Sequence, residues 1–210
     1  MRTRIKFCGC TTVSDVTLAV QTGADAVGLI FAPSPRQVSE EAAREIAQHL
    51  PAFITPVGVF VNPAYEELAL AKSIFPDLVY QLHGDESPAF VSSIDGKVIK
   101  AIHVDPADAD AERIEAEANS HPRAIILFDT KVDGAAGGTG VTFPWRAIAQ
   151  LARTRPVMVG GGLTPDNVSN CVRTVRPYGV DVRNGIETNG RKDALKMRMF
   201  VQAVKDTDAA

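Results

Sequence analysis

Short hydrophobic runs alternate with amphipathic segments along the whole chain. Eight of these runs are rich in β-branched or large apolar residues, as strands buried in a parallel sheet are. We therefore predict strands at Ile5–Cys8, Ala26–Phe31, Ile54–Val61, Leu78–Leu82, Val98–Ile102, Ala124–Phe128, Val157–Val159 and Val180–Val182.

Helical periodicity fills most of the gaps between these runs. It predicts helices at Val13–Val20, Glu40–Leu50, Ala64–Ile74, Ala107–Ala118, Trp145–Ala152, Asp166–Val175 and Ala194–Val204. The segment Ser87–Ile94 is short, and its pattern is weaker. Capping residues support three helix starts, at Ser39, at Asn62 before Pro63, and at Thr164 before Pro165.

The order strand then helix, repeated eight times, is typical of a (β/α)₈ barrel. A doubly wound sheet has the same alternation, but no G-x-G-x-x-G motif follows the first strand. The chain of 210 residues allows about 26 residues for each of eight units, close to the lower limit for this barrel. We predict an α/β protein in which residues 1–210 form a single TIM barrel with eight parallel strands.

Composition and charge exclude some classes of binding partner. The formal net charge is −3 and no Lys/Arg-rich run occurs, so binding to nucleic acid is not expected. The N-terminus lacks the apolar stretch of a signal peptide, and no run approaches the roughly 20 apolar residues of a membrane span. Cys8, Cys10 and Cys171 are interpreted as free thiols, which predicts a cytoplasmic protein. Since neither nucleic acid nor a membrane is an expected partner, we predict that the protein acts on a small molecule.

Polar residues and glycines follow the predicted strands directly. They are Cys8–Thr11, Ser34–Arg36, Asn62, Gln81–Gly84, Asp129-Thr130, Gly160–Gly162 and Asn184-Gly185. In a (β/α)₈ barrel the carboxyl ends of the strands carry the active site. A thiol, a guanidinium, an imidazole and a carboxylate are therefore expected around one pocket.

Strand alternation places Lys6 and Cys8 on the same face of the first strand, toward the barrel interior. A lysine buried there needs a carboxylate, and Asp181 on the neighbouring last strand is the expected partner. The same ammonium would lower the pKa of Cys8 below the usual value of about 8.5. The alternative is that Cys8 packs only as a small buried hydrophobe.

Asp129 is predicted to lie at the pocket mouth, on the wall opposite Cys8. A thiol and a carboxylic acid on facing walls can remove a proton from one atom and deliver one to another, as a proton-transfer isomerase requires. The alternative for Asp129 is a cap on the following loop.

Glycines follow the seventh and eighth strands, where this fold often binds phosphate through backbone N–H groups and a helix N-terminus. Gly161 and Gly162, with Thr164, occupy the first position, and Gly185 precedes the short segment Glu187–Gly190 at the second. We predict that both loops bind a phosphate group.

Several motifs together resemble one family, phosphoribosylanthranilate isomerase, from the first strand to the last helix. They are Lys6–Thr11, Gly23–Ala26, Phe31 with Ser34–Arg36 and Val38-Ser39, Gly58–Asn62, Gln81–Glu86, Phe128-Asp129, Gly137–Gly140, Gly161–Pro165 with Asn167-Val168, Gly179–Val182, and Gly185–Glu187 with Lys192-Asp193.

The resemblance implies a (β/α)₈ enzyme of tryptophan biosynthesis, the third step from chorismate, that performs an Amadori rearrangement without a metal or cofactor. It implies that Asp129 is the general acid on the ribose ring oxygen and that Cys8 is the general base at C2. The residue matching Arg36 pairs with the anthranilate carboxylate, a role suited to its planar fork. Gln81 and His83 are expected beside the substrate, as orienting or hydrogen-bonding groups.

Two positions depart from the family pattern. Cys10 replaces an aliphatic residue, and Arg183-Asn184 replaces two serines after the last strand. Alternation places Arg183 on the face of Asp181, so we expect Arg183 and Asn184 at the phosphate. The alternatives are that Arg183 pairs with Asp181 or that it is solvated at the rim.

Other functions predict different residues. A histidine-pathway isomerase on this barrel would carry an aspartate where this chain has Cys8, and a ribulose-phosphate epimerase would need metal-binding histidines at strand ends. His83 has no such partner if His49, His103 and His121 lie in or beside helices, as predicted. A catalytically silent barrel that binds a phosphorylated ligand also remains open, as does the choice between monomer and homodimer.

Overall fold

The centre of the molecule is a closed barrel of eight parallel strands. We describe it from a computed structural model, in which residues 2–130 and 141–210 are described. The strands are β1 (Arg4–Cys8), β2 (Ala26–Ile30), β3 (Thr55–Phe60), β4 (Val79–Leu82), β5 (Val98–Val104), β6 (Ile125–Thr130), β7 (Val157–Val159) and β8 (Gly179–Val182). They follow chain order and β8 pairs with β1, so the predicted barrel is confirmed. The Gly137–Gly140 motif lies outside the described residues.

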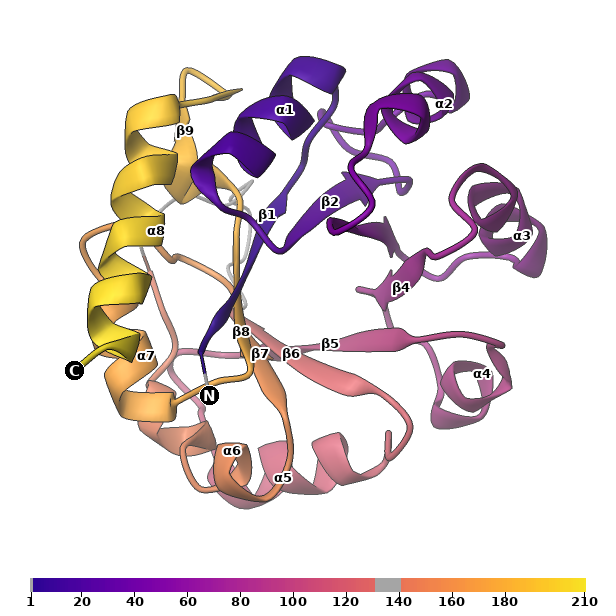
Figure 1. Cartoon of the computed structure of the whole chain (residues 1–210). Coiled ribbons are helices and arrows are strands. Elements are labelled where there is room, and N and C mark those ends of the chain that lie inside the picture. Colours follow the sequence, from indigo (N-terminus) through magenta and orange to yellow (C-terminus); the bar gives the residue numbers. More distant parts are fainter. Residues whose placement is uncertain (1, 131–140) are drawn as a thin grey trace.

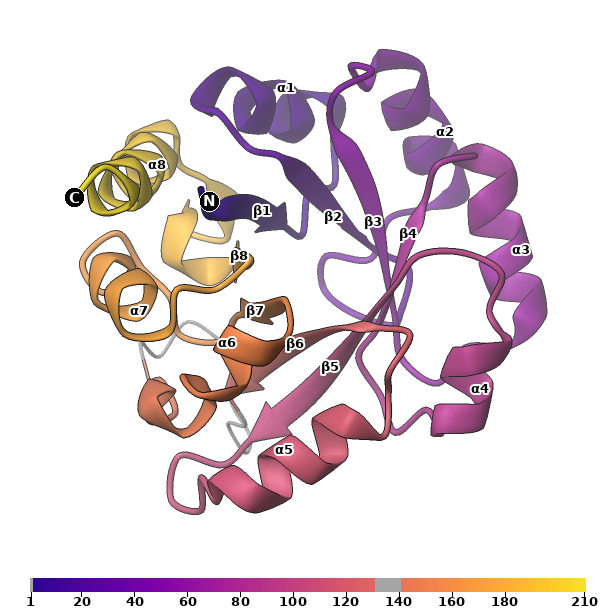
Figure 2. The ribbon, with the colours of Figure 1, turned by 60° about the horizontal axis from the view of Figure 1, so that its bottom comes forward.

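Helices surround the barrel (Figure 1). They are α1 (Val13–Thr22), α2 (Glu40–His49), α3 (Tyr65–Ile74), α4 (Pro88–Ser93), α5 (Ala111–Asn119), the 3₁₀ helix η1 (Trp145–Ile148), α6 (Leu151–Thr154), α7 (Val168–Val175), the 3₁₀ helix η2 (Asn184–Ile186) and α8 (Ala194–Asp208). Helix α8 packs beside α1 and α7, and its end lies near the N-terminus (Figure 2). Among the described residues, no helix is long and apolar enough to cross a membrane.

Three predicted helices differ clearly from the structure. The one predicted to end at Val204 continues to Asp208 as α8. The helix predicted from Ala107 begins only at Ala111, because Asp110 caps it by accepting a hydrogen bond from the backbone N–H of Arg113 at 2.9 Å. The predicted helix Trp145–Ala152 is divided into η1 and α6. The uncertain segment after β4 forms α4, with a proline in its first turn.

The predicted cap at Ser39 is confirmed, since its hydroxyl accepts from the N–H of Ala42 at 3.1 Å. The other two predicted caps are wrong. Asn62 has a positive φ of 47° and its side chain accepts from the N–H of Asp85, so it joins two loops instead. Thr164 donates its own N–H to Asn167, and α7 begins after Asn167.

Apart from a small cluster of Cys8, Ile30, Ala32 and Val59, the buried hydrophobic side chains form two layers. The larger one lies between the strands and the helices and includes Phe7, Phe128 and Phe200, each fully buried. A smaller cluster of Val57, Ile99, Ala101, Leu127 and Met158 fills the barrel itself. The barrel is thus a packed core rather than a pore, and only its ends are available for a site.

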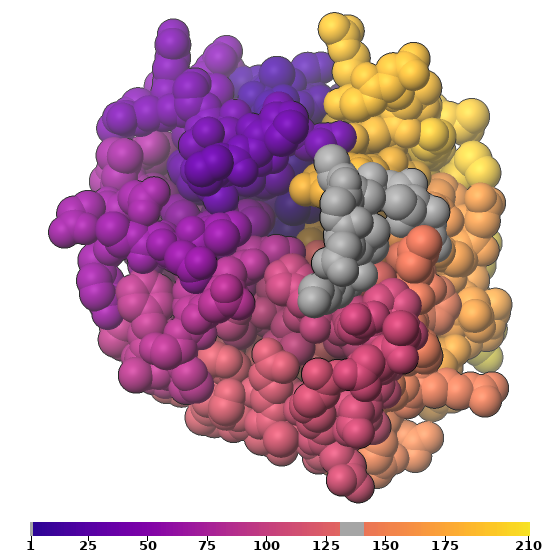
Figure 3. All heavy atoms as spheres, turned by 180° about the vertical axis from the view of Figure 1, so that it is seen from behind, coloured from indigo at the N-terminus to yellow at the C-terminus, as the bar shows by residue number. Residues whose placement is uncertain are grey.

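Seen from the side opposite Figure 1, the chain segments follow one another around the face in sequence order, and the first and last meet at its upper edge (Figure 3). The contact between β1 and β8 closes this circle. Residues at the beginning and the end of the chain are therefore brought into one site.

Candidate active site

A cavity of about 990 Å³ contains most of the predicted site residues, a size typical of small-molecule sites. Residues at or just after strand ends line it. They include Cys8, Gln81, His83, Asp129, Gly161, Gly162, Asp181, Arg183, Asn184 and Gly185. Lys6 lies below this surface, with 1% of its area exposed, and Arg36 lies beside the cavity.

The Lys6 ammonium lies 2.8 Å from Asp181 Oδ1, as the strand alternation predicts. The register explains the pair, because Lys6 and Asp181 are direct partners between β1 and β8. Burial lowers the pKa of Lys6, but the charges of Asp181 and Cys8 outweigh this effect and hold the pKa above its ordinary value. Lys6 is therefore a fixed positive charge beneath the cavity.

Cys8 lies beside the Lys6 ammonium. Gly28 is its partner on β2, and a Cβ atom there would lie 2.8 Å from both Cys8 Sγ and Lys6 Nζ. A glycine therefore provides the space that the thiol and the ammonium share. The predicted lowering of the Cys8 pKa is wrong as a net effect, because burial raises the pKa by more than Lys6 and Lys192 lower it.

Asp129 has a partner that the sequence did not reveal. Its Oδ2 lies 3.2 Å from His83 Nε2, and His83 Nδ1 lies 3.1 Å from the amide nitrogen of Gln81. Burial raises the pKa of Asp129, but the hydrogen bond from His83 and the nearby imidazoles outweigh it and hold the pKa below its ordinary value. Gln81, His83 and Asp129 thus form one chain of contacts from β4 to β6.

The glycines bring the loops after β7 and β8 into close contact with each other, and the first of them into contact with the end of β6. A Cβ atom on Gly161, whose φ is +74°, would lie 2.4 Å from Asp129 Oδ1, so this loop closes directly over the carboxylate. A Cβ atom on Gly185 would lie 1.9 Å from the Leu163 carbonyl oxygen. These positions require glycine because of the close backbone approach. The predicted phosphate loops are therefore adjacent.

The segment Glu187–Gly190 contains no helix. Gly185 lies within η2, and the chain then forms a small antiparallel hairpin of β9 (Glu187–Thr188) and β10 (Arg191–Lys192). Arg183 is half-buried and lines the cavity, and its Nε donates to Asn184 Oδ1 at 3.0 Å. Asp181 is not needed as its partner, because Asp181 already binds Lys6.

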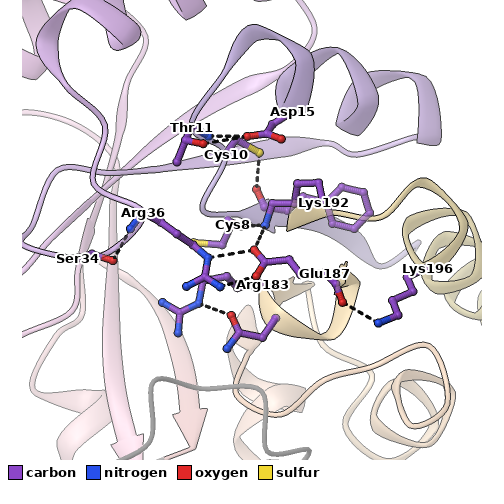
Figure 4. Close-up of polar contacts among 12 residues, drawn as sticks. Cys8, Cys10, Thr11, Asp15, Ser34, Arg36, Arg183, Glu187, Lys192 and Lys196 are labelled. Atoms are coloured by element: carbon purple, nitrogen blue, oxygen red, sulfur yellow. Dashed lines mark hydrogen bonds and ion pairs between the residues drawn. The ribbon is translucent and has the colours of Figure 1, made fainter. Parts of the chain in front are cut away.

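An ionic network joins the hairpin to the beginning of the chain (Figure 4). Glu187 forms one ion pair with Arg36 and a second with Lys192, whose Nζ lies 2.8 Å from the carboxylate. Lys192 also donates to the backbone carbonyl oxygen of Cys8. The side chains of Arg36 and Arg183 both pack against Gly9. A Cβ atom added to Gly9 would lie 3.1 Å from Arg36 Cδ and 3.3 Å from Arg183 Cδ. The predicted carboxylate-binding Arg36 is thus already held by a carboxylate of the chain.

Sequence reasoning missed the roles of Glu187, Lys192 and His103. Glu187 and Lys192 are in the motifs of the family resemblance, and their spacing of five residues with a turn between was a usable signal for a hairpin ion pair. The expectation that His103 lies in or beside a helix is wrong. It lies in β5, and its ring centroid is 4.8 Å from that of His83.

The second part of the Gln81–Glu86 motif has a structural role. Glu86 is buried, binds Lys100 at 2.9 Å and accepts the backbone N–H groups of Asn62 and Gly84. These contacts, against the opposing effect of burial, hold its pKa below the ordinary value. Cys10 is fully buried in the hydrophobic core, in agreement with its interpretation as a small apolar substitute.

Comparisons with known proteins agree on one family. The family model for N-(5'-phosphoribosyl)anthranilate isomerase matches residues 5–203. A protein of that name from Leptothrix cholodnii is 44% identical over 99% of this chain and 93% of its own length. One from Listeria monocytogenes is 39% identical over 97% of this chain and 99% of its own length.

Solved structures lead to the same result. Phosphoribosyl anthranilate isomerase from Thermotoga maritima superposes with a TM-score of 0.87 at 37% identity, covering 97% of this chain and 99% of that one. A further isomerase structure, in complex with reduced 1-(o-carboxyphenylamino)-1-deoxyribulose 5-phosphate, has a TM-score of 0.84 at 36% identity with the same coverage. This chain belongs to the N-(5'-phosphoribosyl)anthranilate isomerase family.

Proposed function

We propose that residues 1–210 form one catalytic domain that converts N-(5'-phosphoribosyl)anthranilate to 1-(2-carboxyphenylamino)-1-deoxyribulose 5-phosphate in tryptophan biosynthesis. Cys8 acts as general base and Asp129 as general acid. The observation that carries this proposal is that the two side chains line one cavity, from β1 and β6. A substrate between them meets a thiol on one side and a carboxyl group on the other.

The reaction consists of proton transfers, which these two groups supply. Asp129 gives a proton to the ribose ring oxygen, the bond from that oxygen to C1 breaks, and a Schiff base forms. Cys8 takes the proton from C2, and the electron pair left behind moves toward the iminium nitrogen. Movement of the C2 hydroxyl proton to C1 then gives the ketone, so substrate and product have the same atoms.

In the resting protein, Cys8 and Asp129 have the opposite protonation states from those that a general base and a general acid need. The pKa of Asp129 is lowered and that of Cys8 is raised, which favours a carboxylate and a thiol at neutral pH. Substrate carries a phosphate and a carboxylate, and their negative charge raises the pKa of Asp129 toward the range a general acid needs. The proton that Asp129 needs is the one that Cys8 loses when it becomes a thiolate, and His83, in contact with Asp129 at 3.2 Å, can relay it. The reaction then returns Cys8 to the thiol and Asp129 to the carboxylate.

Two groups of residues would hold the substrate ends. The adjacent loops with Gly161, Gly162 and Gly185 would bind the phosphate through backbone N–H groups, assisted by Arg183 and Asn184. Arg36 would bind the anthranilate carboxylate by exchanging or sharing its contact with Glu187. Gln81 and His83 would orient the substrate between them.

We further propose a cytoplasmic enzyme that acts as a monomer or homodimer on a small phosphorylated molecule, not on nucleic acid. Its three cysteines, all free and buried, support a reducing compartment. One relative, from Thermotoga maritima, is described as dimeric.

The test is to generate N-(5'-phosphoribosyl)anthranilate enzymatically and add the purified protein. Substrate fluorescence should fall in proportion to the protein concentration, while chromatography detects an isomer of equal mass. A barrel that only binds phosphorylated ligands would leave the fluorescence to decay at the rate of the protein-free control, and this result would contradict the proposal.

A further inference from the structure

Two imidazoles and a carboxylate meet at the ends of three neighbouring strands. His103 in β5 and Asp129 in β6 are direct register partners, and His83 immediately follows β4. One potential ligand atom from each residue lies within 4.8 Å of the other two. The two histidines and Asp129 all line the cavity, so a small ion from solvent can reach them.

One of the three distances between ligand atoms already suits a metal site. A zinc ion binds nitrogen and oxygen at about 2.0–2.2 Å, which sets its ligand atoms roughly 3–3.5 Å apart. His83 Nε2 and Asp129 Oδ2 are already separated by 3.2 Å. His103 is exposed, so its side chain can make the remaining small adjustment without displacing the core.

Surrounding groups orient both imidazoles. His103 Nε2 lies 3.2 Å from the backbone carbonyl oxygen of His83, a contact that fixes the N–H there and leaves the lone pair on Nδ1. His83 Nδ1 contacts the buried amide of Gln81, whose Oε1 has no hydrogen-bond partner among the described residues. Turning this amide by 180° lets Oε1 accept Nδ1–H and leaves His83 Nε2 for a metal.

We propose that His83, His103 and Asp129 form an inhibitory site for a divalent transition-metal ion of the zinc class. Two imidazoles and one carboxylate suit zinc, cobalt or nickel better than magnesium or calcium. The ion replaces the hydrogen bond between His83 and Asp129 and occupies the carboxylate that the proposed reaction uses as its acid. Metal binding is independent of the proposed function, whereas inhibition rests on it.

His103→Gln is the discriminating variant, because His103 is the one ligand of the three to which the proposed function assigns neither a proton transfer nor a substrate contact. Its effect on the pKa of Asp129 cancels when each protein is compared with its own metal-free state. Calorimetric titration of the tag-free protein with Zn²⁺ should show one site in the wild type and at least tenfold weaker binding in His103→Gln. His49→Gln removes an exposed histidine on α2 and should bind as the wild type does. Equal affinity in the wild type and His103→Gln, or no binding to the wild type, would overturn the site.

Co²⁺ distinguishes this site from the cysteine in the same cavity. A thiolate ligand gives an intense near-ultraviolet charge-transfer band, whereas nitrogen and oxygen ligands give only weak visible bands. We expect visible bands alone, lost in His103→Gln, and a thiolate band would assign the ion to Cys8 and contradict the proposal.

Activity provides the last comparison. Zn²⁺ should inhibit the wild type, a chelator should restore it, and the rate of His103→Gln, compared with its own metal-free rate, should resist Zn²⁺. Zinc bound without inhibition would overturn the inhibitory role. If the protein shows no isomerase activity, the proposed function fails but the calorimetric and spectroscopic results still decide the metal site.

Discussion

Arg36 and Glu187, 151 residues apart in the sequence, form a two-contact ion pair beside the cavity. Arg36 Nε lies 3.2 Å from Glu187 Oε1, and Nη2 lies 2.5 Å from Oε2. Because this fork geometry matches a carboxylate, the pair indicates which kind of group the guanidinium is oriented to bind. A substrate carboxylate must therefore displace Glu187 from Arg36 or bind Arg36 beside it.

Arg36→Ala should therefore weaken substrate binding. Loss of a charge-assisted contact worth about 1.5–3 kcal/mol raises KM roughly 10- to 150-fold, with a smaller change in kcat. Arg36→Lys retains the charge but not the fork, so it should recover only part of the loss. Steady-state kinetics of the three proteins measures this, and an unchanged KM in Arg36→Ala would assign the carboxylate to another residue.

Glu187→Gln should reduce the stability of the protein more than the loss of an exposed ion pair does. Lys192 and Glu187 are exposed by only 3% and 5% of their side-chain area, so removing the negative charge leaves a buried ammonium without its partner. We expect the free energy of unfolding to fall by about 3–5 kcal/mol. Glu40→Gln, which breaks the exposed pair with Arg44, is the matched control and should change it by about 0.5 kcal/mol or less. Equal effects in urea denaturation would contradict a structural role for the network.

Arg183→Ser restores the serine of the family pattern and should raise KM for the phosphorylated substrate. The side chain lines the cavity close to Gly185 and Asn184, and its charge favours a phosphate there. Because salt screens this attraction, the difference from the wild type should diminish as ionic strength rises. An unchanged KM at low ionic strength would leave phosphate recognition to the backbone.

Cys8 should react slowly with alkylating reagents at neutral pH. Its pKa is raised by burial, so the thiolate, which is the reactive form, increases only above the ordinary thiol pKa of about 8.5. Lys6 lowers this pKa, and Lys6→Met should therefore shift the reactivity midpoint to still higher pH. Cys10 and Cys171, whose pKa values burial raises to about 12, are internal references in mass spectrometry. A midpoint below pH 8 would contradict the assigned effect of burial.

The barrel could be predicted because its signal is local and repeated. Each strand is a short apolar run, and alternation within the first strand, together with the closure of the barrel, predicted the ion pair between Lys6 and Asp181. Helix starts were less predictable, since the hydrogen bonds that a given polar side chain makes decided them, locally at Asp110 and Asn167 and with a distant loop at Asn62. Asn62 does not cap a helix because its backbone N–H and side chain bind Glu86 and Asp85.

The contacts of the site were harder to predict than its members. Which carboxylate meets Arg36 depends on how a hairpin after the last strand folds over the first. The net pKa of Cys8 depends on a balance between burial and charge that the sequence does not contain. His103 was misplaced because β5 extends to Val104, two residues beyond its obvious apolar run.

Single-turnover and steady-state kinetics of Cys8→Ala and Asp129→Asn test whether Cys8 and Asp129 perform the two proton transfers. Asp129→Asn is isosteric and Cys8→Ala removes only the sulfur atom, and circular dichroism shows whether the fold is retained. We predict that kcat falls at least about 100-fold in each variant while KM changes little, because each residue acts on a separate proton. Turnover near the wild-type rate in either folded variant would remove that residue from the mechanism.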